Sequence, residues 1–238
     1  MKKFILLLIT GFSFILFSLL HTECSKKDNE PEPKNDTWDI DKDGIPEFIT
    51  TNYIELDKVH RISKFRSSQG HDYSDGFESC RSMKHYFEPK STEDWGSIKI
   101  YSPVTGKITR LEQEWAGTRV EIVSDEYPAF RFSIFHITLS EPLTLNGQVT
   151  AGQQLGTHVG SQTMSDIAVL VNDPTRQGRM VSYFETITDA VFELYRARGL
   201  NNRDDIIISK AVRDANPLTC NGDSFVSTDV LENWITLN

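Results

Sequence analysis

The sequence predicts a mainly β protein with a small helical extension at its C-terminal end. From about residue 98 to residue 135, short runs rich in β-branched and aromatic residues follow one another between glycines and prolines. Four glycines then punctuate residues 147–160, and an apolar run at 167–171 is expected to form a buried strand. After Asp173 the pattern changes to helical spacing, which marks the extension.

The N-terminal segment has the composition of an export signal. Lys2 and Lys3 precede the apolar stretch 4–20, and its length of about 17 residues suits a secretory signal better than a spanning helix. Cys24 follows, and the segment resembles the start of a bacterial lipoprotein, in which residues 1–23 are removed and Cys24 carries the lipid. A cleaved signal peptide and an uncleaved anchor are the alternatives.

A polar, proline-rich tether is expected after Cys24. Its lysines, followed by acidic residues, make it similar to the tethers of lipoproteins from the Bacteroidetes lineage. A lipid on Cys24 would hold the protein at the outer membrane, on the periplasmic or the cell-surface face.

The charge of the chain excludes nucleic acid as an expected partner. The whole chain has 25 basic and 34 acidic residues and a net charge of −9; loss of Lys2, Lys3 and Glu23 makes it −10. Phosphate binding requires a basic footprint that this balance does not provide. The length beyond the tether, about 200 residues, predicts one main domain.

An acidic loop interrupts the tether, which is expected to span residues 24–50. Asp39, Asp41 and Asp43 alternate before Gly44, as oxygen ligands do in a calcium-binding loop. Thr50 stands at the twelfth loop position, where a bidentate acid is usual, so a solvated acidic turn is the alternative.

The predicted strands and helices give the order of the remaining chain. A β domain is expected at 51–173, and a helical extension packed on it at 174–238. Helical spacing with basic last-turn residues and Gly199 predicts a helix over 188–199, and a shorter helix is expected at 227–234. The expected strands are 98–101, 106–111, 119–123, 130–135 and 167–171.

Two cysteines remain if Cys24 carries lipid. Cys80 and Cys220 are an even pair in an oxidising compartment, which favours a disulfide between the tail and the early part of the domain. Two free, buried thiols are the alternative.

Four ordered segments carry motifs of a known family. They are the His-x-x-x-Asp spacing at His71 and Asp75, the strand and turn 100–108, the strand 132–137 and the glycine turn 149–156. In this order they resemble the lysostaphin/LytM-type zinc endopeptidases. The resemblance implies an antiparallel, sandwich- or barrel-like β core known as the duplicated hybrid motif.

The resemblance also implies a zinc site that this chain has altered. His71 and Asp75 correspond to zinc ligands and His136 to a catalytic histidine, whereas the family's His-x-His strand is replaced by one with Asp166 and Ala168. Side chains alternate along a strand, so Asp166 and Ala168 are expected on the face turned towards the site. Alanine has no donor atom, and a catalytic zinc needs three protein ligands.

Two functions follow from the altered site. One is an envelope module that binds peptidoglycan or an envelope protein without cleaving it. The other is an active zinc hydrolase with a rebuilt centre, in which Asp166 joins His71 and Asp75 as a metal ligand and also acts in catalysis with His136; His136 or His158 could replace the missing ligand instead. A calcium-stabilised surface module, with calcium in the Asp39–Asp43 loop, is a third possibility.

Overall fold

The computed structural model describes residues 35–238. The expected signal peptide at 1–23 and the lipidation site Cys24 lie outside the described residues. From Lys34 to Asn238 the chain forms one compact unit, and the expected boundaries after residues 50 and 173 fall within it. The end of the expected tether belongs to the core, because Ile40, Phe48 and Ile49 are buried in it.

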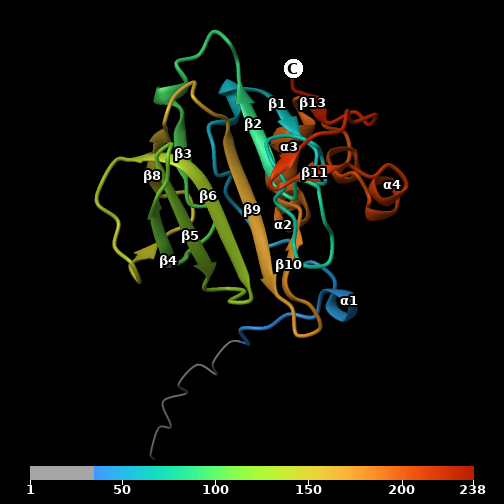
Figure 1. Ribbon diagram of the computed structural model, residues 1–238. Coiled ribbons are helices and arrows are strands. Elements are labelled where there is room, and N and C mark those ends of the chain that lie inside the picture. The colour runs from blue at the N-terminus through green and yellow to red at the C-terminus, as the bar shows by residue number, and fades with distance from the viewer. Residues whose placement is uncertain (1–34) are drawn as a thin grey trace, which may run out of the picture. The chain divides into compact units, whose positions relative to one another are not determined.

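The core is built on one large antiparallel sheet, and the prediction of a mainly β fold with few helices is confirmed (Figure 1). Along its main path the strands follow the order β13-β1-β2-β9-β6-β5-β4-β7; β10 pairs with β9, and β8 joins β3 to β6. The strands of this sheet are β1 (Val59–Ser63), β2 (His85–Pro89), β3 (Lys99–Tyr101), β4 (Gly106–Gln113), β5 (Thr118–Ser124), β6 (Phe130–Leu139), β7 (Gln148–Val149), β8 (Gln154–His158), β9 (Ser165–Asn172), β10 (Gln177–Val181) and β13 (Trp234–Thr236).

The C-terminal part of the chain adds strands as well as helices. β10 and β13 extend the sheet, while β11 (Cys220–Asn221) and β12 (Ser224–Phe225) form a separate hairpin. The helices are α1 (Ile40–Asp43), α2 (Tyr183–Thr186), α3 (Asp189–Arg196) and α4 (Lys210–Ala215), with 3₁₀ turns at Leu56–Lys58, Trp95–Ser97 and Arg203–Ile206. Between residues 35 and 238, no helix is long and apolar enough to cross a membrane.

One of the two predicted helices is confirmed and the other is wrong. α3 forms within 188–199 and buries Val191, Phe192 and Tyr195, and the chain leaves it through Gly199 at a φ of 98°. Residues 227–234 form no helix. Asp229, an acidic residue in the first turn of the expected helix, instead binds the buried guanidinium of Arg213 through both carboxylate oxygens.

The predicted calcium loop is a helical turn. Asp39 caps α1 by accepting a hydrogen bond from the Lys42 backbone N–H at 3.1 Å. Asp41 pairs with Arg179 at 2.7 Å, and Asp43 lies 3.7 Å from the Lys42 ammonium. Each carboxylate points to a different partner, and the three are not grouped around one point in this structure.

Candidate functional site

The candidate site lies on the face of the sheet opposite the main core. Along β9, Ile167, Val169 and Val171 enter the main core, so Asp166 and Ala168 lie together on the other face, as strand alternation predicts. The antiparallel register places Tyr86 of β2 opposite Asp166 and Ser133 of β6 opposite Ala168. Figure 1 shows β9 between β2 and β6, so this face is assembled from three strands that are distant in sequence.

Lys84, immediately before β2, supplies the cation of this site. Its ammonium donates to Asp166 Oδ2 at 3.0 Å, and the two side chains are only 3% and 1% exposed. Aromatic rings surround the ammonium at 3.7 Å (Phe135), 4.3 Å (Tyr73) and 5.8 Å (Tyr86). The faces of aromatic rings have a negative electrostatic potential, which stabilises a desolvated cation. The carboxylate and the rings therefore form a closed cage around a lysine.

The segment that leads to Lys84 covers this part of the sheet. Phe65, Met83, Phe135, Ala168 and Met180 pack into a second buried cluster between the segment and the sheet. The Cys80–Cys220 disulfide, which the sequence favoured, is confirmed and ties this segment to β11. The side chain of Ala168, which stands where the family has a ligand, is thus a packing group within the cluster.

His71 and Asp75 do not join Asp166 in a metal site. His71 is exposed, and its Nδ1 donates a hydrogen bond to the Asp72 carbonyl at 2.9 Å. Asp75 accepts backbone hydrogen bonds from Phe77 at 2.9 Å and from Met180 at 3.0 Å. The expected ligand pair is therefore a pair of loop residues, and the Asp75 carboxylate organises the backbone.

His136 lies beside Asp166, as expected of a residue of the same site. It stands in a bulge of β6 at a φ of 62°, an uncommon conformation for a residue other than glycine. Its Nδ1 donates to the Ala116 carbonyl at 2.9 Å, while Nε2 lies 3.8 Å from Asp166 Oδ1. The bulge thus turns the imidazole towards the carboxylate without a direct hydrogen bond.

His158 of β8 is another titratable side chain near this site, where it interacts electrostatically with His136 and Asp166. The residue is 1% exposed, and Nδ1 accepts a hydrogen bond from the Gly160 backbone at 3.3 Å. Burial lowers the pKa of His158 to about 4. Within the described chain, His158 Nε2 and Asp166 Oδ1 have no hydrogen-bond partner.

The residues of the site do not fit a zinc ion. Across residues 35–238, no three His, Cys, Asp or Glu side chains are grouped so that they could hold a metal. Asp166, the one carboxylate at the centre, already neutralises the Lys84 ammonium at 3.0 Å. A zinc ion there would displace or confront a buried positive charge.

Lys84 was missed by the sequence interpretation. Its ring partners include Tyr86 two positions later in the chain, but Asp166 is 82 residues away. The only local signal is a lysine before an aromatic strand, and most lysines are exposed. The pairing of β2 with β9 is what gives Lys84 its role.

Comparisons with known proteins found similar solved structures at low identity. No protein-family model matches the chain, and no curated protein matches it. Among solved structures, Helicobacter pylori Csd3 has a TM-score of 0.43 and 17% identity over 60% of this chain, which spans 34% of that chain. The catalytic domain of lysostaphin from Staphylococcus simulans has a TM-score of 0.32 and 17% identity, over 48% of this chain and 94% of its own.

A third match is a structure of the SpoIIQ–SpoIIIAH pore-forming complex, with a TM-score of 0.42 and 12% identity, over 63% of this chain and 98% of that chain. The structural neighbours thus include peptidase domains of the LytM/lysostaphin type.

Proposed function

We propose that the protein is an envelope lipoprotein whose LytM/lysostaphin-like domain binds a partner and does not hydrolyse it. The observation that carries this proposal is the Lys84–Asp166 ion pair. A lysine ammonium can neutralise the carboxylate and hold the surrounding groups in place, but it is not a Lewis acid and brings no water to attack a carbonyl. The cage keeps the architecture of a cation site while supplying no metal chemistry.

The energetics of the ion pair support this assignment. A buried ion pair is strongly destabilised when one partner is removed, because a desolvated charge remains. A metal could bind Asp166 only if the Lys84 ammonium moved away from the three aromatic rings and paired with another anion. The exchange also requires movement of the covering segment, which the disulfide holds.

The partner proposed from the sequence is peptidoglycan or an envelope protein, reached from a lipid anchor on Cys24 at the outer membrane. The domain itself is acidic overall, which favours partners other than nucleic acid. A domain without hydrolytic activity acts by binding such a partner with its surface.

A second candidate function is an active zinc-dependent hydrolase with a rebuilt site. His136 favours it, because a strained backbone at a φ of 62° holds its Nε2 3.8 Å from Asp166, and strain of this kind is common at active sites. This candidate requires Lys84 to leave the cage and zinc to bind Asp166 together with His136 or His158.

Metal content and hydrolysis separate the two candidates. Protein from Lys34 to Asn238, purified without chelator or affinity metal, is dialysed against zinc and measured by mass spectrometry beside Asp166→Ala and His71→Ala variants. We expect zinc well below one equivalent in all three, and no cleavage of purified peptidoglycan. One zinc per chain that Asp166→Ala removes, together with cleavage that the same variant abolishes, would establish the hydrolase.

A further inference from the structure

A cluster of cationic side chains lies on the same sheet face, beside the covered site, and Arg119 contacts the Phe135 ring of that site at 4.9 Å. We name it the arginine face: Lys107 and Arg110 of β4, Arg119 of β5 and Arg131 of β6. The register places Lys107 opposite Val123, and Val123 opposite Arg131. Residues in register on neighbouring strands share a face, so Lys107 and Arg131 lie on one face with Val123 between them.

A single buried carboxylate stands beneath three of the guanidinium groups. Glu121, with its side chain 6% exposed, is ion-paired with Arg119 and lies 3.9 Å from Arg110 and 3.8 Å from Arg131. Glu112 is the second acid, 3.3 Å from Arg110. Arg110 and Arg131 remain 49% and 44% exposed, so both have N–H groups left to offer a ligand.

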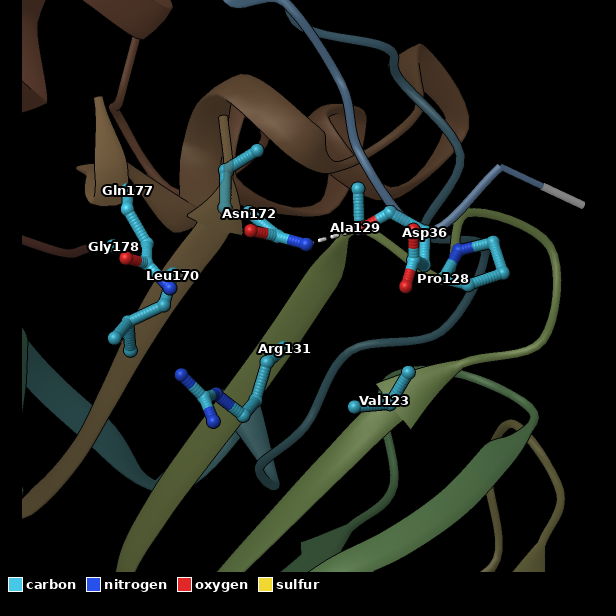
Figure 2. Close-up of a pocket in the computed structure, with 10 residues that line it drawn as sticks. Asp36, Val123, Pro128, Ala129, Arg131, Leu170, Asn172, Gln177 and Gly178 are labelled. Atoms are coloured by element: carbon cyan, nitrogen blue, oxygen red, sulfur yellow. Dashed lines mark hydrogen bonds between the residues drawn. The ribbon is translucent and has the colours of Figure 1, made fainter. Parts of the chain in front are cut away.

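A groove adjoins this cluster. It has a volume of about 480 Å³, and its walls include Arg131, Val123 and Leu170, with Asp36 as its acidic residue. Figure 2 shows Arg131 between Val123 and Leu170 on neighbouring strands. The groove thus combines a guanidinium with aliphatic walls.

We infer that the arginine face binds an extended acidic peptide segment of a partner protein. This inference rests on the proposed function, in which the domain acts by binding. Alternate side chains of an extended peptide lie about 7 Å apart on one side, and Arg110 and Arg131 both reach towards the same Glu121 carboxylate, at 3.9 Å and 3.8 Å. Carboxylates at alternate positions can therefore reach Arg110 and Arg131 together, and guanidinium binds carboxylate in a bidentate geometry.

Charge complementarity selects this occupant. The chain as a whole is acidic, so a ligand of negative charge is repelled by most of the surface and attracted here. The aliphatic walls at Val123 and Leu170 favour a peptide with carbon chains beside its carboxylates over a bare inorganic anion. Long-range attraction of this kind sets specificity and the rate of encounter.

The test is fluorescence anisotropy with a labelled peptide that alternates serine and glutamate, against the same peptide with glutamine. We expect the glutamate peptide to bind and to weaken as salt is raised, and Arg131→Gln and Arg110→Gln each to weaken it by about fivefold. Arg196→Gln on α3 is the matched control, because this arginine is also 44% exposed and paired with one acid. Glu121→Gln should strengthen binding, a gain that misfolding does not produce.

Equal binding of the glutamate and glutamine peptides would overturn the inference, as would Arg131→Gln and Arg110→Gln proteins that bind like the Arg196→Gln control while keeping their thermal midpoints. Binding to purified peptidoglycan that these variants leave unchanged, without binding to the glutamate peptide, would also overturn it. Zinc-dependent cleavage together with glutamate-peptide binding would refute the proposed function and leave the arginine face standing, so the two failures are distinguishable.

Discussion

Replacement of Lys84 by methionine should destabilise the protein by about 3–5 kcal/mol, the usual cost of leaving a buried charge without its partner. Methionine keeps the apolar stem among the rings but removes the ammonium. At the observed 3.0 Å separation, the attraction lost is about 5 kcal/mol at an effective dielectric constant of about 20. Asp166, 1% exposed, is then left as a desolvated carboxylate without its cation.

The assay is urea unfolding at neutral pH with the disulfide intact, followed by circular dichroism. Lys84→Met combined with Asp166→Leu should recover most of the loss, because two isosteric apolar side chains leave no unpaired charge. Lys42→Met is the control: its ion pair with Asp43 is exposed at 3.7 Å, so about 0.5 kcal/mol or less is expected. A loss below about 1 kcal/mol for Lys84→Met, or a double variant no more stable than the single one, would refute the buried ion pair.

Three further predictions follow from other parts of the fold. Reduction of the disulfide, whose cysteines are 140 residues apart, should lower the free energy of unfolding by up to about 5 kcal/mol, measured by urea unfolding with and without reductant. Burial lowers the pKa of His85 to about 4, so stability should fall as the pH decreases from about 6.5 to 4, by on the order of 3 kcal/mol for this residue; His85→Gln should flatten the profile, and an unchanged slope would contradict this. Gly106→Ala, measured by thermal melting, should cost about 2 kcal/mol or more, because its Cβ would lie 2.1 Å from the Val123 carbonyl oxygen. In the same melts Gly76→Ala, with nothing within 4 Å of its Cβ, should stay within about 0.5 kcal/mol.

The pH prediction has a definite sign. Unfolded histidine binds a proton near pH 6.5, whereas His85 in the fold stays neutral until about pH 4. Between these values the unfolded chain binds more protons, so lowering the pH favours unfolding. Two hydrogen bonds hold the neutral ring: Nδ1 donates to the Ser63 carbonyl, and Nε2 accepts from the Ser182 hydroxyl.

The strand predictions were correct for the longer strands, whose sequences show the burial pattern directly. Alternation between an apolar and a polar face is visible within a single segment, and it identified β4, β5 and β6 and put Asp166 and Ala168 on one face of β9. α3 was also evident, because helical spacing and Gly199 at its end are local features. Short strands such as β1 and β2 were missed, since their few residues show too little alternation to be distinguished from loops.

The site was predicted only in part. His136 and Asp166 lie beside each other as expected, with 3.8 Å between Nε2 and Oδ1, but His71 and Asp75 do not join them. A His-x-x-x-Asp spacing specifies a distance along the chain and not the direction in which the loop is folded. Asp75 accepts hydrogen bonds from the backbone N–H groups of the nearby Phe77 and the distant Met180, and a loop carboxylate can take such partners in place of a metal.

The sequence by itself determined the β class, the positions of the long strands, the alternation that turns Asp166 away from the core, and a cysteine pair suited to a disulfide. These features depend on residues close together in the chain. Only the tertiary structure decided that Lys84 meets Asp166, that Ile40, Phe48 and Ile49 belong to the core and that the cations of β4, β5 and β6 form one face. Each of those outcomes depends on which strands pair and in which register, a choice made by the burial of the whole sheet and by no single segment.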